Sequence, residues 1–428
     1  MAGCGLGGSS HGALGQPYAG TLTYWFWGDS DAPGATEWIK EMAARYVRLH
    51  PQLRINIVPQ ATDTLIGAFR TAAQTRSGPD IATQWATLPT LTPAWIGASV
   101  PLDHLVPAEE IRNWIGTDEN RSFGKLWAMP IYLLGAPFVW NRTLFTRAGL
   151  NPDRPPRTWT QLLQTCARLR SAGITPIAMG NKDGFTGAWF FSMYGRQNLN
   201  SINELKHAML GRESFRAPRF SGFYSALEQL VHQRCFNSDV ASLDLNQGWQ
   251  LFPAGKGAMA WTTDGNVLQW ERTMGSGAIG VGQTPTWGNG KLARWYDTTQ
   301  SSDAFITSWS RHQAAAAAFL VWLHRPENLE AWYERTGVFP ADRRFRASQV
   351  KDSVARRLFA LDTGLPGVWP ENYLPPQVDQ NADLPGGEQI TSGSGDARTA
   401  VDLWLRVIQQ WRTEHPGEWQ QYARWTGP

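Results

Sequence analysis

The chain has 428 residues, of which 42% are hydrophobic and 18% charged, and its formal net charge is +3. This length accommodates two or three domains with full cores, and a small charge without any basic run argues against a nucleic-acid partner. No apolar run reaches the roughly 18 residues of a membrane span. The 23 tryptophans exceed what a core requires, so we expect many of them on the walls of a binding surface.

The N-terminus reads Met1-Ala2-Gly3-Cys4 and continues into the glycine-rich stretch GLGGSS. Ala-Gly-Cys before such a tether resembles the end of a bacterial lipoprotein signal, whose cysteine is lipidated after cleavage. The apolar segment of a signal is missing, and a chance cysteine in a terminal segment is the alternative interpretation. We expect residues 1–19 to form a tether that is lipidated at Cys4.

Strands and helices alternate after this segment. Residues Thr21 to Trp27 form a β-branched and aromatic run without charge, which is typical of a strand buried on both faces of a parallel sheet. The pattern then predicts a helix over Ala35 to Leu49, a strand over Arg54 to Pro59 and a helix over Leu65 to Arg76. This βαβα order indicates an α/β sheet.

The most informative stretch of the chain is 124–167. A buried apolar strand that ends in an aromatic-Asn pair leads into a short helix, which Gly149 terminates. A proline-rich turn follows, and Thr158 is placed to cap a second helix, with Gln161 completing a capping box.

This stretch resembles the extracellular solute-binding proteins of ABC importers that take up sugars, the family typified by maltose-binding protein. The family carries Gly-Lys-x-x-x-x-Pro, an aromatic-Asn pair (here Trp140-Asn141), Phe-x-x-Ala-Gly-Leu and Pro-x-Thr-Trp in this order. The resemblance covers about residues 20–345, whereas the helical region from Arg346 onward is less diagnostic. It continues through further motifs: SGPDI at 77–81, LFPAGKGAM at 251–259 and AIGVGQTP at 278–285.

The resemblance implies a two-lobed periplasmic-binding-protein fold of type II, in which a three-segment hinge joins two α/β sheets and a ligand cleft lies between them. The N-terminal lobe would comprise residues 20–128 and 285–323, and the C-terminal lobe residues 129–284 and 324–428. The implied protein is a monomeric lipoprotein without a cofactor, anchored to the outer face of the bacterial cell membrane. It would capture a carbohydrate and deliver it to the permease subunits of an ABC transporter.

The loop after the first strand supplies two candidate ligand contacts, Asp29 and Asp31, because the family uses a Gly-Asp pair there to bind sugar hydroxyls. The alternative for this loop is that Ser30 or Asp31 caps the following helix. Near residue 261 the chain departs from the family's Gly-x-Trp pattern, which puts that wall in doubt, and the later tryptophans could instead pack on a hairpin. The other candidates are aromatic or polar residues at or near the family's cleft positions: Gln84, Trp85, Trp189, Phe190, Trp261, Asp264, Asn266, Trp287, Trp295 and Trp369.

Flat aromatic faces with scattered Asp, Asn and Gln suit a pyranose. Stacking one sugar face on an indole removes about 100 Å² from water, or roughly 2.5 kcal/mol, and the rim hydroxyls need partners because an unpaired buried polar group costs about 1–3 kcal/mol. The candidate loops carry acidic residues and few basic ones. Neutral oligosaccharides and amino sugars therefore rank first among ligands, and anionic compounds rank last.

A tryptophan-lined cleft with two carboxylates also describes a glycosidase, with Asp29 and Asp264 as the pair. The chain has no Walker A run, Gly-x-Ser-x-Gly elbow, His-Glu-x-x-His or Cys-x-x-Cys, and its 8 histidines show no metal-ligand spacing. We therefore expect a receptor rather than an enzyme.

In an exported protein Cys166 and Cys235 either form a disulfide or remain buried thiols.

Overall fold

The computed structural model of the protein describes residues 18–62 and 64–427. The predicted lipidation site at Cys4 and nearly all of the predicted tether lie outside the described residues. Within the part of the chain that is described, no helix combines the length and the apolar character that a bilayer span requires.

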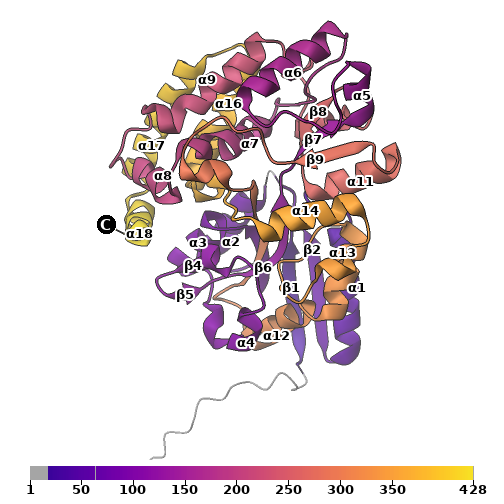
Figure 1. Ribbon diagram of the computed structural model, residues 1–428. Coiled ribbons are helices and arrows are strands. Elements are labelled where there is room, and N and C mark those ends of the chain that lie inside the picture. The colour runs from indigo at the N-terminus through magenta and orange to yellow at the C-terminus, as the bar shows by residue number, and fades with distance from the viewer. Residues whose placement is uncertain (1–17, 63, 428) are drawn as a thin grey trace, which may run out of the picture.

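A five-stranded sheet forms the centre of the first lobe, the lower one in Figure 1. Strand β1 pairs in parallel with β2 and β3, whereas β10 runs antiparallel to both β3 and β6. The strand order is β2 (Leu53–Pro59), β1 (Gly20–Phe26), β3 (Ile81–Trp85), β10 (Thr298–Ile306) and β6 (Met129–Gly135).

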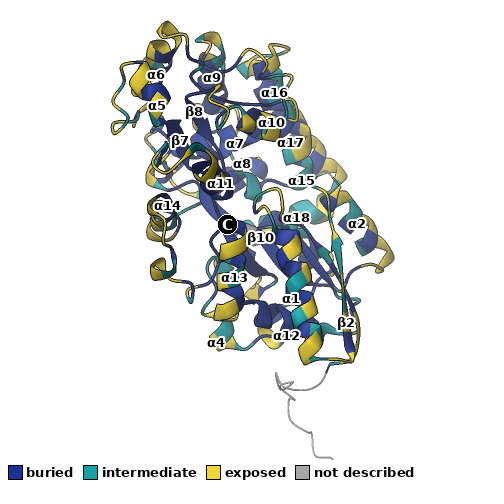
Figure 2. Cartoon of the chain, turned by 90° about the vertical axis from the view of Figure 1, so that its right-hand side faces the viewer, coloured by how far each residue is buried: buried dark blue, intermediate teal, exposed yellow. Residues whose placement is uncertain are grey.

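Helices cover both faces of this sheet, and the predicted βαβα order is confirmed. The core includes Leu22, Tyr24 and Phe26 of β1, none of which has any exposed surface, as expected for a strand between two helical layers. Figure 2 shows the buried strands inside and exposed residues on the outer helix faces. The helices of this lobe are α1 (Ala35–Leu49), α2 (Leu65–Thr75), α3 (Leu88–Trp95), α4 (Ala108–Ile111), α12 (Gln313–Leu323) and α13 (Pro326–Thr336).

The second lobe is built on a smaller, three-stranded sheet with the order β8 (Met259–Trp261), β7 (Phe138–Asn141) and β9 (Ile279–Gly282). Both strand pairs are antiparallel. Helix α7 is buried on all sides because other helices enclose it. The helices of this lobe are α5 (Arg142–Arg147), α6 (Trp159–Ser171), α7 (Phe185–Tyr194), α8 (Ile202–Met209), α9 (Pro218–His232), α10 (Leu245–Gln250), α11 (Asp264–Met274), α16 (Leu384–Ser392) and α17 (Ala397–Glu414).

Several further elements lie where the lobes meet. Helix α14 (Ser353–Gly364) contacts β6, β9 and α11, and the last helix, α18 (Pro416–Thr426), contacts α3 and α8. Between them the chain forms the short segments η6 (Pro370–Tyr373), α15 (Pro376–Val378) and η7 (Asp379–Asp383).

Two elements assigned to the second lobe by the sequence pack with the first. Strand β6, which begins at the expected boundary of residue 129, pairs with β10 in the larger sheet. Helix α13, expected in the segment 324–428, contacts α1. Contacts with segments distant in the sequence decide to which lobe these two elements belong, and the local sequence carries little information on such contacts.

Helix α6 begins after Thr158 as predicted, but only one of the two hydrogen bonds of the predicted capping box is formed. The Gln161 backbone N–H donates to Thr158 Oγ1 at 3.3 Å. The Gln161 side chain accepts from the Arg157 backbone N–H at 2.8 Å, one residue before the position that the full box requires. At Gly149 the predicted helix end is confirmed by a left-handed φ of 71°.

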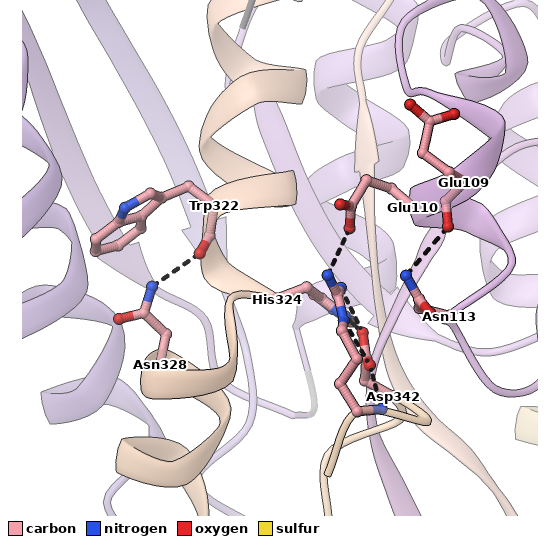
Figure 3. A network of polar contacts seen from close by, with 8 residues as sticks. Glu109, Glu110, Asn113, Trp322, His324, Asn328 and Asp342 are labelled. Carbon is pink, nitrogen blue, oxygen red and sulfur yellow. Dashed lines mark hydrogen bonds and ion pairs between the residues drawn. The ribbon is translucent and has the colours of Figure 1, made fainter. Parts of the chain in front are cut away.

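A polar network ties the end of α12 to α4 (Figure 3). His324 Nδ1 lies 2.8 Å from Asp342 Oδ2, and both side chains are almost fully buried. Arg344 pairs with the same carboxylate at 2.8 Å and with Glu110 at 2.9 Å. Burial raises the pKa of Asp342, but hydrogen bonds from His324 and Arg344 outweigh burial and hold the pKa below its usual value.

Cys166 and Cys235 are both buried, and no disulfide joins them in the structure. Of the two alternatives for these cysteines, the structure therefore shows buried thiols.

Candidate functional site

A cavity of about 650 Å³ opens between the lobes, at the carboxyl ends of the parallel strands β1 and β3. This is where ligands of open α/β sheets bind, and the volume lies in the range of small-molecule sites. The first lobe lines it with Trp27, Ser30, Asp31, Thr62, Ile66, Trp85, Pro89, Leu134 and Thr299. The second lobe contributes Lys182, Asp183, Phe185, Trp189, Asp244, Leu245, Asn246 and Trp249, and the late loop adds Trp369, Glu371, Asn372, Leu374, Pro376, Asp379 and Gln380.

Two indoles form the aromatic wall of the first lobe. Trp27 follows β1 directly, and its Nε1 donates to Thr62 Oγ1 at 2.9 Å. Trp85 ends β3 and meets Trp27 edge-on, with 5.4 Å between the ring centroids. Trp27 is 4% exposed, whereas Trp85 is half-buried. Trp85 therefore retains the ring surface on which an apolar ligand face can stack.

Three indoles from separate segments form the opposite wall. Trp189 of α7 lies 5.3 Å from Trp249 of α10 and 5.2 Å from Trp369, measured between ring centroids. The Nε1 of Trp249 donates to the Trp261 carbonyl at 2.9 Å. All three side chains are largely buried, so each offers little ring surface to a ligand.

Carboxylates make up nearly all of the charged lining of the cavity, where Lys182 is the one Lys or Arg among the described lining residues. Glu371 accepts a hydrogen bond from Trp369 Nε1 at 3.0 Å. Burial, reinforced by the charge of Asp379, raises the pKa of Glu371 well above its usual value. Burial likewise raises the pKa of Asp379 to about 6. The acidic lining residues are Asp31, Asp183, Asp244, Glu371 and Asp379.

A chain of hydrogen bonds joins the two lobes at the edge of the cavity. Asn372 Nδ2 donates to Thr299 Oγ1 at 3.3 Å, and this hydroxyl donates to Glu119 Oε2 at 3.1 Å. Burial raises the pKa of Glu119 to about 7. These bonds connect the late loop to β10 and stabilise the lobe arrangement seen here.

Four of the predicted ligand contacts line the cavity, namely Asp31, Trp85, Trp189 and Trp369. Asp29 is not among the lining residues, and its role in binding stays a prediction. Its Oδ1 accepts from the backbone N–H groups of Gly34 and Thr36 at 3.1 and 3.2 Å, so this carboxylate caps the start of α1.

The other predicted contacts lie outside the cavity lining, in the described part of the chain. Gln84 is buried within β3. Asp264 Oδ2 accepts from the Gly135 N–H at 3.1 Å, and Asn266 Nδ2 donates to Thr262 Oγ1 at 3.1 Å. The aromatic residues of this group pack in or against the core of the second lobe: Phe190, Trp261, Trp287 and Trp295. A role of any of these residues in binding stays a prediction.

Sequence reasoning missed several lining residues. Trp27 immediately precedes the loop that carries Asp29 and Asp31, and Glu371 lies two residues after the predicted contact Trp369, so nearby signals existed for both. No comparable signal marked Trp249, Asp183 or Asp379, because they reach the cavity through the packing of α10, α7 and η7.

The lining can stack an apolar ring face, accept hydrogen bonds and attract positive charge. The carboxylates named for the glycosidase alternative, Asp29 and Asp264, do not line the cavity. Among the described residues no group of three or more His, Cys, Asp or Glu side chains is arranged to hold a metal ion.

Comparison with known proteins gives a consistent result. Residues 32–330 match the sequence profile of bacterial extracellular solute-binding proteins. The sn-glycerol-3-phosphate-binding periplasmic protein UgpB of Salmonella paratyphi A is 25% identical over 242 residues, 49% of each chain. UgpB of Escherichia coli K12 is 24% identical over 242 residues, again 49% of each chain. The chain thus spans about half the length of the curated relatives it matches.

Solved structures share the fold over nearly the whole chain. A chitin oligosaccharide binding protein superimposes with a TM-score of 0.82 at 16% identity, covering 92% of this chain and 98% of the other. The solute receptor AcbH, described as preferring β-D-galactopyranose, gives 0.77 at 14% identity, with 92% and 99% covered. The GacH receptor of Streptomyces glaucescens gives 0.70 at 17% identity, with 92% and 98% covered. The expected two-lobed α/β fold is therefore confirmed.

Proposed function

Since the chain belongs to the family of bacterial extracellular solute-binding proteins, we propose that it is the substrate-binding lipoprotein of an ABC importer. It captures a carbohydrate in the cavity between its lobes and delivers it to a membrane permease. The ligand is a neutral oligosaccharide or an amino sugar.

The observation that carries this proposal is the pairing of aromatic walls with carboxylates in one cavity. Indoles stand on both sides of it, with Trp85 on one lobe and Trp189 and Trp369 facing from the other. Burying about 100 Å² of a pyranose face on an indole is worth roughly 2.5 kcal/mol, and carboxylate oxygens are strong acceptors for the hydroxyls around the ring. Solute-binding proteins of this shape close by hinge motion around the ligand.

The charge of the lining argues against the ligand for which the relatives are named. Sn-glycerol 3-phosphate is an anion, and an anion in this cavity would face Asp31, Glu371 and Asp379 with Lys182 as the one Lys or Arg in the described lining. Like-charge contact in a partly dry cavity is unfavourable. A neutral or cationic sugar avoids this cost.

The anchor and the transport partner complete the proposal. Cys4 after Ala2-Gly3 supports a lipid anchor on the outer face of the cell membrane. A monomeric receptor on such a tether can reach permease subunits in the same membrane. The glycosidase alternative has weaker support, because the carboxylate pair that suggested it lies outside the cavity lining.

The proposal is tested by thermal-shift and calorimetric titration of the purified protein with mono- and disaccharides, amino sugars and sn-glycerol 3-phosphate. We expect a raised melting temperature with at least one sugar, no shift with the phosphate ester, and an unchanged sugar on chromatography afterwards. Binding of the phosphate ester alone, or steady conversion of a sugar to product, would contradict the proposal.

A further inference from the structure

The geometry points to a subsite for a protonated amine between Asp31 of the first lobe and Glu371 and Asp379 of the late loop. We infer that the preferred ligand is a hydroxyl-rich ring that carries an ammonium group, as an amino sugar does. This inference rests on the proposed function, and it decides between the two ligand classes that the proposal leaves open.

The three carboxylates line one cavity and come from two separate parts of the chain. Asp31 follows β1, Glu371 lies in η6 and Asp379 begins η7, and all three are lining residues. The side chains that donate hydrogen bonds to the two late-loop carboxylates are neutral. Trp369 Nε1 donates to Glu371 at 3.0 Å, and Gln380 Nε2 donates to Asp379 at 2.8 Å. Neutral donors leave the negative charge of the pair uncompensated.

A fourth carboxylate, Asp383, interacts electrostatically with Glu371 and Asp379. Asp383 has no exposed surface, and neither of its carboxylate oxygens has a hydrogen-bond partner among the described residues. The same is true of Asp379 Oδ1. Burial raises the pKa of Asp383 well above its usual value, and the charges of Glu371 and Asp379 raise it further. Buried carboxyl oxygens without partners are costly and rare. Asp383 itself is not a lining residue, so a cation in the cavity would contact Glu371 and Asp379 and act on Asp383 only through its charge.

An ammonium group supplies what the cluster lacks. It brings one positive charge and up to three N–H donors, and charge-assisted hydrogen bonds are roughly twice as strong as neutral ones. In the absence of such a ligand, the raised pKa values of Glu371 and Asp383 favour their protonated forms. The described carboxylates are not arranged as ligands of a metal ion. The neighbouring indole of Trp85 adds the apolar surface that a sugar ring needs and a simple amine does not.

Calorimetry at pH 7 with matched probes tests the inference: the β-1,4-linked disaccharide of glucosamine, its N,N′-diacetyl counterpart, cellobiose, and putrescine as an amine without a ring. We expect the glucosamine disaccharide to bind at least tenfold more tightly than the other three, and added salt to narrow the difference. The Glu371→Gln/Asp379→Asn double variant should reduce the preference to less than about threefold. The control Glu330→Gln, at an exposed site on α13, should leave it unchanged.

The outcomes separate the inference from the proposed function. The ammonium subsite would be overturned if the acetylated disaccharide or cellobiose bound as tightly as the glucosamine disaccharide or more tightly. It would also be overturned if the double variant kept the preference for the glucosamine disaccharide. Either result would still be consistent with a sugar receptor. Tighter binding of putrescine than of the glucosamine disaccharide would overturn the inference that the ligand carries a sugar ring. If no sugar of the broader panel binds, the proposed function itself fails. Melting curves of the double variant establish that it is folded, and we expect it to be at least as stable as the wild type because it loses two carboxyl groups whose ionisation burial opposes.

Discussion

Replacing Trp85 tests whether aromatic stacking holds the ligand. Trp85 is the half-buried indole at the end of β3, and it meets Trp27 edge-on at 5.4 Å. Its exposed ring surface lines the cavity, so Trp85→Ala removes ligand contact while it leaves most of the core in place.

The magnitude follows from the apolar area. A sugar face that covers about 100 Å² of the indole contributes roughly 2.5 kcal/mol at ~25 cal/mol/Å², and partial coverage contributes less. We expect Trp85→Ala to cost about 1–3 kcal/mol of binding free energy, which corresponds to a Kd that rises between about 5- and 150-fold. Isothermal titration calorimetry with the tightest-binding sugar of the panel measures this change.

The matched control is Trp25→Ala. Trp25 is also half-buried and lies on β1, but it packs against the cluster around Phe69 and does not line the cavity. We expect this variant to lose stability and keep its affinity. An unchanged Kd in Trp85→Ala, or equal losses of affinity in both variants, would refute the stacking argument.

Three further predictions concern stability and anchoring. Trp189→Ala should lower the free energy of unfolding by about 3–5 kcal/mol in denaturant titration, because this indole is 8% exposed between two others; a change below 1 kcal/mol would contradict its place in the core. Asp362→Asn should raise the melting temperature at pH 7.5, because we expect it to raise the free energy of unfolding by about 1–3 kcal/mol. Burial raises the pKa of Asp362 to about 6, and burial together with the charge of Asp362 raises the pKa of Asp264. A carboxyl with a raised pKa in the folded state costs stability as the pH rises through that value, so the stability gained by Asp362→Asn should vanish near pH 4. A stability gain that persists at pH 4 would exclude ionisation of Asp362 as the cause. Cys4→Ala in the full precursor should release the protein from the membrane fraction, and quantitative retention would rule out the lipid anchor.

Local patterns were sufficient for the elements of the first lobe. The run from Thr21 to Trp27 is uncharged and β-branched, and the structure has β1 over Gly20–Phe26. Helix α1 begins and ends at the predicted residues, because its apolar face and Pro51 mark it within the sequence itself. Such features depend only on neighbouring residues, and they also carried the resemblance from which the fold was predicted.

Features that depend on distant segments were not predictable in the same way. Strand β10 inserts between β3 and β6, and nothing local specifies those neighbours. Asp264 was predicted as a ligand contact, and in the structure it is buried with its carboxylate against the backbone of Gly135. Asp29 was predicted as a ligand contact, and in the structure its carboxylate accepts hydrogen bonds from the backbone N–H groups of Gly34 and Thr36 at the start of α1. In each case a partner that the sequence does not reveal decides what the side chain does.

A crystal structure of the complex with the tightest-binding sugar of the panel tests the central claim most directly. The account predicts that the sugar lies in the cavity between the lobes, with one ring face on Trp85 and hydroxyl or amino groups within hydrogen-bonding distance of Glu371 or Asp379. A sugar bound on the outer surface, with this cavity free of it, would contradict the account.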